Sequence, residues 1–182
     1  MAAKAVVSST LALRIFALFF LIGSLVVLVT NNFTFVDVHK ITFKDIAAYR
    51  YVFSAAAIGA SFTLLYIPFV IYHVYRAKGT ILPEFLLNFD YYADKVINNL
   101  LAAGVGAAFA YSMELKKFLS GLLDSLIVIG VPDADKLKSE ATKFLDRGSF
   151  ASSLLLIGFV CMTVLSILSS AKRTKNTRDS SY

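Results

Sequence analysis

Two residues of opposite charge interrupt or border the apolar stretches of this sequence, and they are its most informative chemical groups. Arg14 lies near the start of the run LALRIFALFFLIGSLVVLVT, residues 11–30, and Asp94 begins the run DKVINNLLAAGVGAAFAYSM. A charge within hydrocarbon is costly, so it needs a partner, a route to the interface or a function. An arginine and a carboxylate can satisfy each other through a bidentate charge-assisted bond.

Other reactive groups are sparse. The two histidines, His39 and His73, have no cysteine or acidic neighbour at the spacing of metal ligands, and the single cysteine, Cys161, allows no intrachain disulfide. We therefore expect no catalytic residues, no metal site and no cofactor. The net charge of +6 is not gathered into a basic stripe with interleaved aromatic residues. The pattern argues against nucleic-acid binding and favours anionic lipid as the partner of the basic residues.

Composition assigns the chain to the membrane. Of its 182 residues 58% are hydrophobic and 16% charged, and the mean hydropathy is +0.71. About 20 mostly apolar residues cross a hydrocarbon core of about 30 Å. Four runs meet this length, at residues 11–30, 52–74, 91–113 and 149–171. They predict an all-α, four-transmembrane-helix bundle that forms a single domain over residues 1–182.

The segments outside the predicted spans differ in character. The short tails, residues 1–10 and 172–182, are predicted to be disordered. The first outer loop is short, whereas the second contains an apolar stretch, residues 119–131, and a charged run, KLKSEATKFL. We expect this second loop to form amphipathic helices that lie on the outer leaflet. Asn32 begins a formal glycosylation sequon, but it abuts the first span, so we expect it to remain unmodified.

Charge also predicts the orientation and the relation between Arg14 and Asp94. The basic segment KRTKNTR directly follows the fourth span and predicts that both termini are cytoplasmic. The first and third spans then run parallel, which places the two residues at similar depth. They either pair or snorkel separately to the interface, and the residues alone favour neither interpretation. A proton or ion relay is disfavoured because no acidic, basic or histidine residue lies between Val96 and Met113.

Small residues recur in the second and third spans at the four-residue spacing that lets helices approach closely. Packing within one bundle is their more frequent use, and self-association is the alternative. The candidate helix-packing positions are Ala55, Gly59, Ala102, Gly104 and Gly106.

Four stretches together resemble the plant Casparian strip membrane domain protein family, which is distantly similar to the animal MARVEL tetraspan proteins. They are LALRIFALFFLIGSLVVLVTN, YRYVFSAAAIGASFTLLYIPFVIYHV, DKVINNLLAAGVGAAFA and SSLLLIGFVCMTVLSILSS. The family carries an arginine in the first span and an aspartate in the third, which match Arg14 and Asp94. The resemblance therefore implies an intramembrane ion pair. The second loop lacks the cysteines of the strip-forming members, so the chain is similar to the CASP-like branch.

This resemblance implies a function without a known reaction. We expect a non-enzymatic plasma-membrane protein that forms homo-oligomers or assembles with related tetraspans and acts as a membrane scaffold or organiser of partner proteins. A link to membrane domains that face the cell wall would follow from the family. The alternative is a small transporter or channel subunit, which would need polar residues along a path through the bundle.

Overall fold

Four long helices dominate the computed structural model, which describes residues 2–35, 39–76, 84–130 and 134–179. They are α1 (Ala2–Thr30), α2 (Ala47–Arg76), α3 (Glu84–Val128) and α4 (Ala134–Asp179). Each is long and apolar enough to cross a membrane. The predicted all-α, four-helix membrane fold is confirmed, and the predicted spans at 11–30, 52–74, 91–113 and 149–171 lie within these helices.

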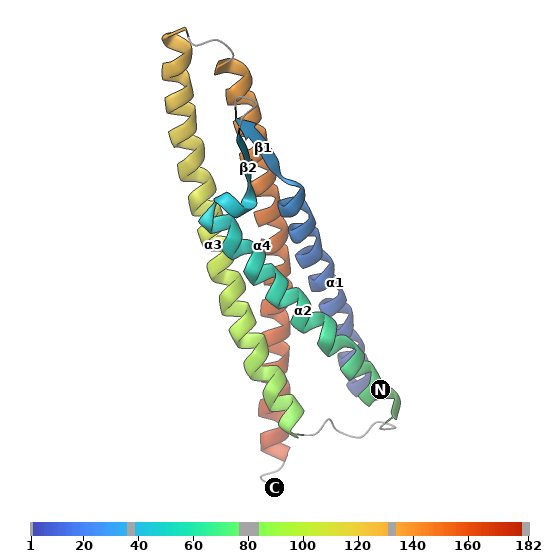
Figure 1. Ribbon diagram of the computed structural model, residues 1–182. Coiled ribbons are helices and arrows are strands. Elements are labelled where there is room, and N and C mark those ends of the chain that lie inside the picture. Colours follow the sequence, from blue (N-terminus) through green and yellow to red (C-terminus); the bar gives the residue numbers. More distant parts are fainter. Residues whose placement is uncertain (1, 36–38, 77–83, 131–133, 180–182) are drawn as a thin grey trace.

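The helices form a bundle in which α1 and α3 occupy opposite corners. Helix α1 packs against α2 and α4, and α3 packs against the same two helices. Both chain ends lie at one end of the bundle, which we call the termini end (Figure 1). We call the opposite end the hairpin end. Side chains of all four helices fill the interior, including the fully buried Leu21, Val52, Leu101 and Leu155.

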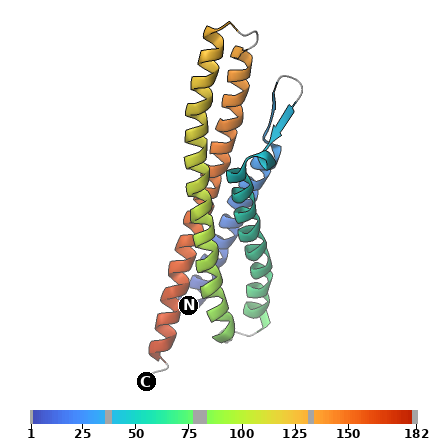
Figure 2. The ribbon, with the colours of Figure 1, turned by 60° about the vertical axis from the view of Figure 1, so that its left-hand side comes forward.

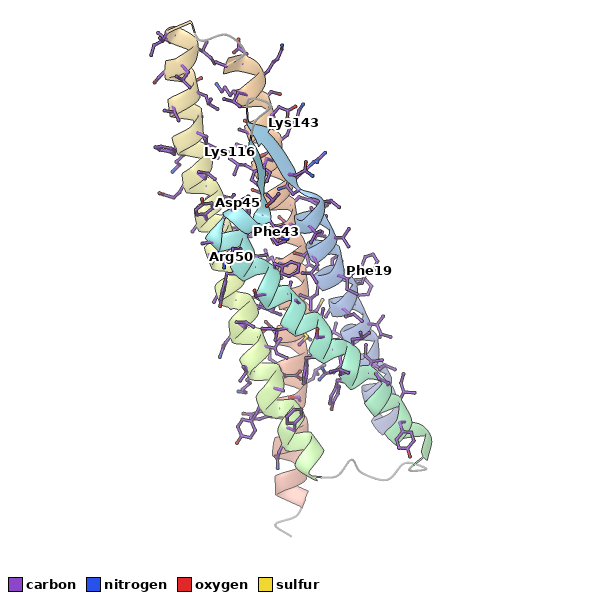
Figure 3. All side chains as sticks on the ribbon, viewed as in Figure 1. Phe19, Phe43, Asp45, Arg50, Lys116 and Lys143 are labelled. Atoms are coloured by element: carbon purple, nitrogen blue, oxygen red, sulfur yellow. The ribbon has the colours of Figure 1, made fainter. Side chains whose placement is uncertain are left out.

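The outer surface of the bundle is apolar, as a lipid-facing surface must be. Phe19 is 72% exposed and projects away from the bundle (Figure 3), and Phe16, Leu65 and Val96 are similarly exposed. Transferring such side chains into hydrocarbon is favourable, by roughly 1.5–3 kcal/mol for full burial. Large apolar side chains therefore point both inward and outward, which is typical of a bundle surrounded by lipid.

The third connection differs from the expected helices on the leaflet. Helices α3 and α4 instead continue beyond the hairpin end as an antiparallel pair, which we call the extension (residues 114–128 and 134–148; Figures 1 and 2). Leu123, Ala141 and Leu145 are buried within it. Part of the apolar side of each amphipathic segment is thus buried against the other helix, while Phe118 and Leu122 remain exposed. At 1.5 Å per residue, the 45 residues of α3 reach about 68 Å, far more than the membrane needs.

The extension ends at a backbone position that suits glycine. Gly130 has φ of +80°, a left-handed conformation that side chains with a Cβ rarely adopt. It lies two residues beyond the end of α3, and its N–H donates to the carbonyl of Ile127. A glycine in this conformation is a common helix terminator.

The terminal segments are not disordered in the structure, contrary to the expectation from composition. Residues 2–10 form the first turns of α1, and residues 172–179 form the last turns of α4. Each segment continues a helix that is already nucleated, so adding a residue requires no new costly first turn. Residues 1 and 180–182 lie outside the described part of the chain.

The connection between α1 and α2 contains a short β-hairpin that composition alone did not predict. Strands β1 (Asn32–Phe35) and β2 (His39–Thr42) pair antiparallel, with Asn32 opposite Thr42. A single 3₁₀ turn, η1 (Phe43–Asp45), then leads into α2, and the Asp45 carboxylate accepts hydrogen bonds from the backbone N–H and the hydroxyl of Thr42. This capping contact fixes the start of the turn.

Candidate functional site

The structure brings Arg14 and Asp94 together inside the bundle. Their side chains are 4% and 0% exposed. Arg14 Nη2 donates to both carboxylate oxygens, at 3.1 Å to Oδ1 and 2.9 Å to Oδ2. One nitrogen therefore chelates the carboxylate, whereas the expected bidentate geometry uses two. The contact joins α1 to α3, which otherwise occupy opposite corners of the bundle.

A third helix completes this site, and sequence reasoning missed its residue. The ring of Tyr66 on α2 lies 4.2 Å from the guanidinium carbon of Arg14, measured to the ring centroid. The negative face of an aromatic ring attracts a cation at this distance. Tyr66 lies 28 positions before Asp94 in the sequence, and no spacing pattern relates the two residues. Only the folded structure therefore reveals the contact. Arg14, Asp94 and Tyr66 thus tie α1, α3 and α2 together.

A second polar contact lies one helical turn further along α3. Asn98 is four residues beyond Asp94, and its Oδ1 accepts a hydrogen bond of 3.0 Å from the hydroxyl of Thr163 on α4. This bond and the contacts of Arg14 together place interhelical polar contacts on all four helices.

Three of the candidate small residues pack within the bundle. Ala55 is fully buried, and a Cβ added to Gly104 would meet the Ala55 methyl group at 3.4 Å. A Cβ added to Gly59 would meet Leu21 at 3.3 Å. These close approaches link α2 to α3 and α1, in keeping with the role of small residues in helix packing.

The other two small residues do not pack within the bundle. Ala102 and Gly106 are exposed, and a Cβ added to Gly106 would meet nothing within 4 Å. They lie on the opposite side of α3 from the buried Leu101, Val105 and Ala108. Small residues at the four-residue spacing therefore lie on two faces of α3. Only the inner face packs against other helices of the same chain.

The hairpin end is held by hydrogen bonds that the sequence did not reveal. Ser24 donates to the carbonyl of Ala151 at 2.8 Å, and the amide nitrogen of Asn31 donates to the carbonyl of Phe144 at 2.8 Å. The buried hydroxyls of Tyr49 and Ser112 lie 3.1 Å apart and share a hydrogen bond. These contacts connect α1 to α4 and α2 to α3.

The last candidate residue is Asn32, at the possible glycosylation site. Asn32 is exposed at the start of β1, and its side-chain amide nitrogen donates to the carbonyl of Thr30 at 3.3 Å. That Asn32 is not glycosylated stays a prediction. Within residues 2–35, 39–76, 84–130 and 134–179 no three His, Cys, Asp or Glu side chains come close enough to hold a metal ion. The arrangement of Arg14, Asp94 and Tyr66 is suited to holding helices together.

Replacement of Tyr66 tests whether its ring stabilises the buried guanidinium. Tyr66→Leu removes the ring face and should lower the free energy of unfolding by about 1–2 kcal/mol, since a desolvated cation–π contact contributes about that much. Tyr66→Phe keeps the face and should lie much closer to the parent protein. Reversible unfolding in mixed micelles measures both. Equal losses in the two variants would instead assign the effect of Tyr66 to its hydroxyl group.

The chain is similar to known proteins over most of its length. Residues 3–120, which include nearly all of α1, the whole of α2 and most of α3, match the model of the Casparian strip membrane protein domain. The chain is 38% identical to CASP-like protein 4D1 of Ricinus communis over 166 residues, 89% of each chain. It is 35% identical to CASP-like protein 4D2 of Arabidopsis thaliana over 168 residues, 91% of this chain and 89% of the relative. No solved structure matches the chain.

The matched region contains both members of the ion pair and the residue stacked on it, and the similarity to the CASP-like relatives extends over nearly the whole bundle. The chain is a multi-pass membrane protein that belongs to the Casparian strip membrane protein family, in its CASP-like branch.

Proposed function

We propose that this protein is a non-enzymatic plasma-membrane tetraspan that self-associates through α3 and serves as a scaffold for partner proteins. The observation that carries the proposal is the lipid-facing side of α3. Exposed small residues line it over several turns, with one exposed amide: Asn99, Ala102, Ala103, Gly106 and Ala110.

Two features of this α3 face favour another helix as its neighbour. Small side chains let a second backbone approach closely enough for extensive van der Waals contact, which lipid tails provide less well. The Asn99 side chain is exposed on the same face, and its amide would gain hydrogen-bond partners there that hydrocarbon does not offer. A second copy of the chain supplies both the smooth surface and a second amide.

The exposed face of α1 offers a contrast. It presents large side chains, among them Ile15, Phe16, Phe19 and Ile22. Such a surface is well solvated by lipid and has no polar group to satisfy. The difference between the two faces is what selects α3 as the interface.

The interior of the bundle supports a scaffold over the alternative of a transporter or channel. Between the polar layer of Asn98 and Thr163 and the hairpin end, the fully buried Leu101 and Leu155 and the Ala55 and Gly104 contact fill the space among the helices. Substrate paths in transporters are lined by polar groups and water. Ion or solute flux through proteoliposomes that contain only this protein would favour the transporter instead.

The proposed orientation places the termini end in the cytoplasm. It rests on Lys172, Arg173, Lys175 and Arg178, which follow the fourth span directly. In a Cys161→Ser background, a cysteine at Thr177 should react with a membrane-impermeant maleimide only after permeabilisation, whereas one at Thr34 should react in intact cells. The reverse pattern would invert the topology.

Disulfide cross-linking tests the proposed interface. In the Cys161→Ser background, Ala103→Cys should form covalent dimers in native membranes under mild oxidation, because the two α3 helices approach closely at this face. Adding Gly106→Leu should weaken dimerisation about tenfold, the equivalent of about 1.4 kcal/mol of lost packing. The dimer fraction on non-reducing gels gives the result.

The matched control is Ile22→Cys, on the exposed face of α1. It lies eight residues from Arg14, while Ala103 lies nine residues from Asp94, so the two thiols have similar depth. Equal cross-linking at both positions would indicate random collision and contradict the proposal.

A further inference from the structure

The extension contains a cavity bordered by two salt bridges. One joins Lys116 on α3 to Asp146 on α4 at 2.8 Å, and the other joins Lys138 on α4 to Asp124 on α3. The bridges are eight residues apart on each helix, about 12 Å at helical rise. Figure 3 shows Lys116 and Lys143 on the two helices of this region.

Small hydroxyl side chains leave space between the two bridges. Ser120 is midway between Lys116 and Asp124, and Thr142 is midway between Lys138 and Asp146. Both line a cavity of about 260 Å³. Its floor is apolar, formed by Leu119, Leu123, Ala141 and Leu145. The volume lies just below the usual range for small-molecule pockets, so the occupant must be compact.

The charges that line the cavity all have one sign. Lys116, Lys117 and Lys138 border it, and its lining includes no acidic residue. Lys117 forms no ion pair among the described residues that surround it. Each hydroxyl already donates within its own helix, Ser120 to the carbonyl of Lys117 and Thr142 to the carbonyl of Lys138. The lysines are therefore the groups that would recognise a ligand.

The salt bridges do not prevent an anion from binding these lysines. The side chains of the Lys116–Asp146 pair are 54% and 58% exposed, and those of the Lys138–Asp124 pair 38% and 58%. Exposed pairs of this kind contribute about 0–1 kcal/mol, so an incoming anion can compete with the carboxylates. Lysine ammonium groups bind phosphate and carboxylate as point charges.

We propose that this cavity binds a compact organic anion, a phosphate or carboxylate joined to a small apolar group. The anion would contact the lysines while the apolar group covers the leucine floor. Lys116 lies one helical turn beyond Ser112, near the end of the apolar run, so the cavity is close to the headgroup region. The same chemistry is available from a phospholipid headgroup and from a soluble molecule.

Calorimetric titration of the full-length protein in phosphatidylcholine nanodiscs tests the proposal, with phenyl phosphate as the probe. Binding should saturate, and it should be at least about tenfold tighter than that of inorganic phosphate or phenol. Inorganic phosphate has the charge without the apolar group, and phenol has the apolar group without the charge. Absence of saturable binding, or equal affinity for inorganic phosphate, would overturn the proposal.

Three variants separate this cavity from general surface charge. Lys117→Gln removes a charge at the rim and should weaken binding about tenfold, and Ser120→Leu should abolish binding by filling the cavity without a change of charge. Lys143→Gln removes the same charge from an exposed site outside the cavity and should have no effect. Circular dichroism and the unfolding midpoint establish that each variant is folded. A loss in Lys143→Gln equal to that in Lys117→Gln, or unchanged binding in Ser120→Leu, would overturn the proposal.

The source of the anion follows from a second set of nanodiscs that contain phosphatidic acid. If phenyl phosphate then binds the parent protein more weakly, while the residual binding of Lys117→Gln does not change, the lipid headgroup occupies the cavity. If the affinity of the parent protein is the same in both membranes, the occupant is soluble. Either result supports an anion site, and the two assign its ligand differently.

Discussion

The buried ion pair between Arg14 and Asp94 is the constraint on which the rest of the bundle depends. Neither charge can face hydrocarbon without a large desolvation cost, so each must stay beside the other. Because the two residues belong to helices at opposite corners, their contact fixes the depth and rotation of α1 relative to α3. Helices α2 and α4 then fit between them, where Tyr66 contacts the guanidinium and Thr163 contacts Asn98.

The rotation of α3 also determines which of its small residues face the bundle and which face lipid. Gly104 and Ala108 turn inward and allow close packing, which leaves Ala102 and Gly106 facing lipid. The same helix therefore holds the bundle together on one side and offers the proposed contact to a second copy on the other. Beyond the hairpin end, α3 and α4 pair only with each other, and the small Ser120 and Thr142 leave the cavity between their salt bridges.

The features that follow from charge and length were predictable from the sequence. Four apolar runs imply four helices, and parallel first and third helices place Arg14 and Asp94 at one depth. Their pairing required the family resemblance in addition, since separate snorkelling fits the same residues. Tyr66 was missed because an aromatic residue in a span is not distinctive until its neighbour is known. The extension was predicted wrongly because an amphipathic helix can pack on lipid or on another helix, and its sequence does not distinguish the two. The tails were predicted wrongly because their composition does not show that the helix of the neighbouring span continues into them.

A double-mutant cycle tests whether the ion pair holds the bundle together. The free energy of unfolding in mixed micelles is measured for Arg14→Leu, Asp94→Leu and the double variant. Each single substitution leaves an uncompensated buried charge and should cost about 3–5 kcal/mol, whereas the double substitution should recover most of that loss. Losses that simply add in the double variant would show two independent residues, and the pair would then not be the constraint that sets the bundle.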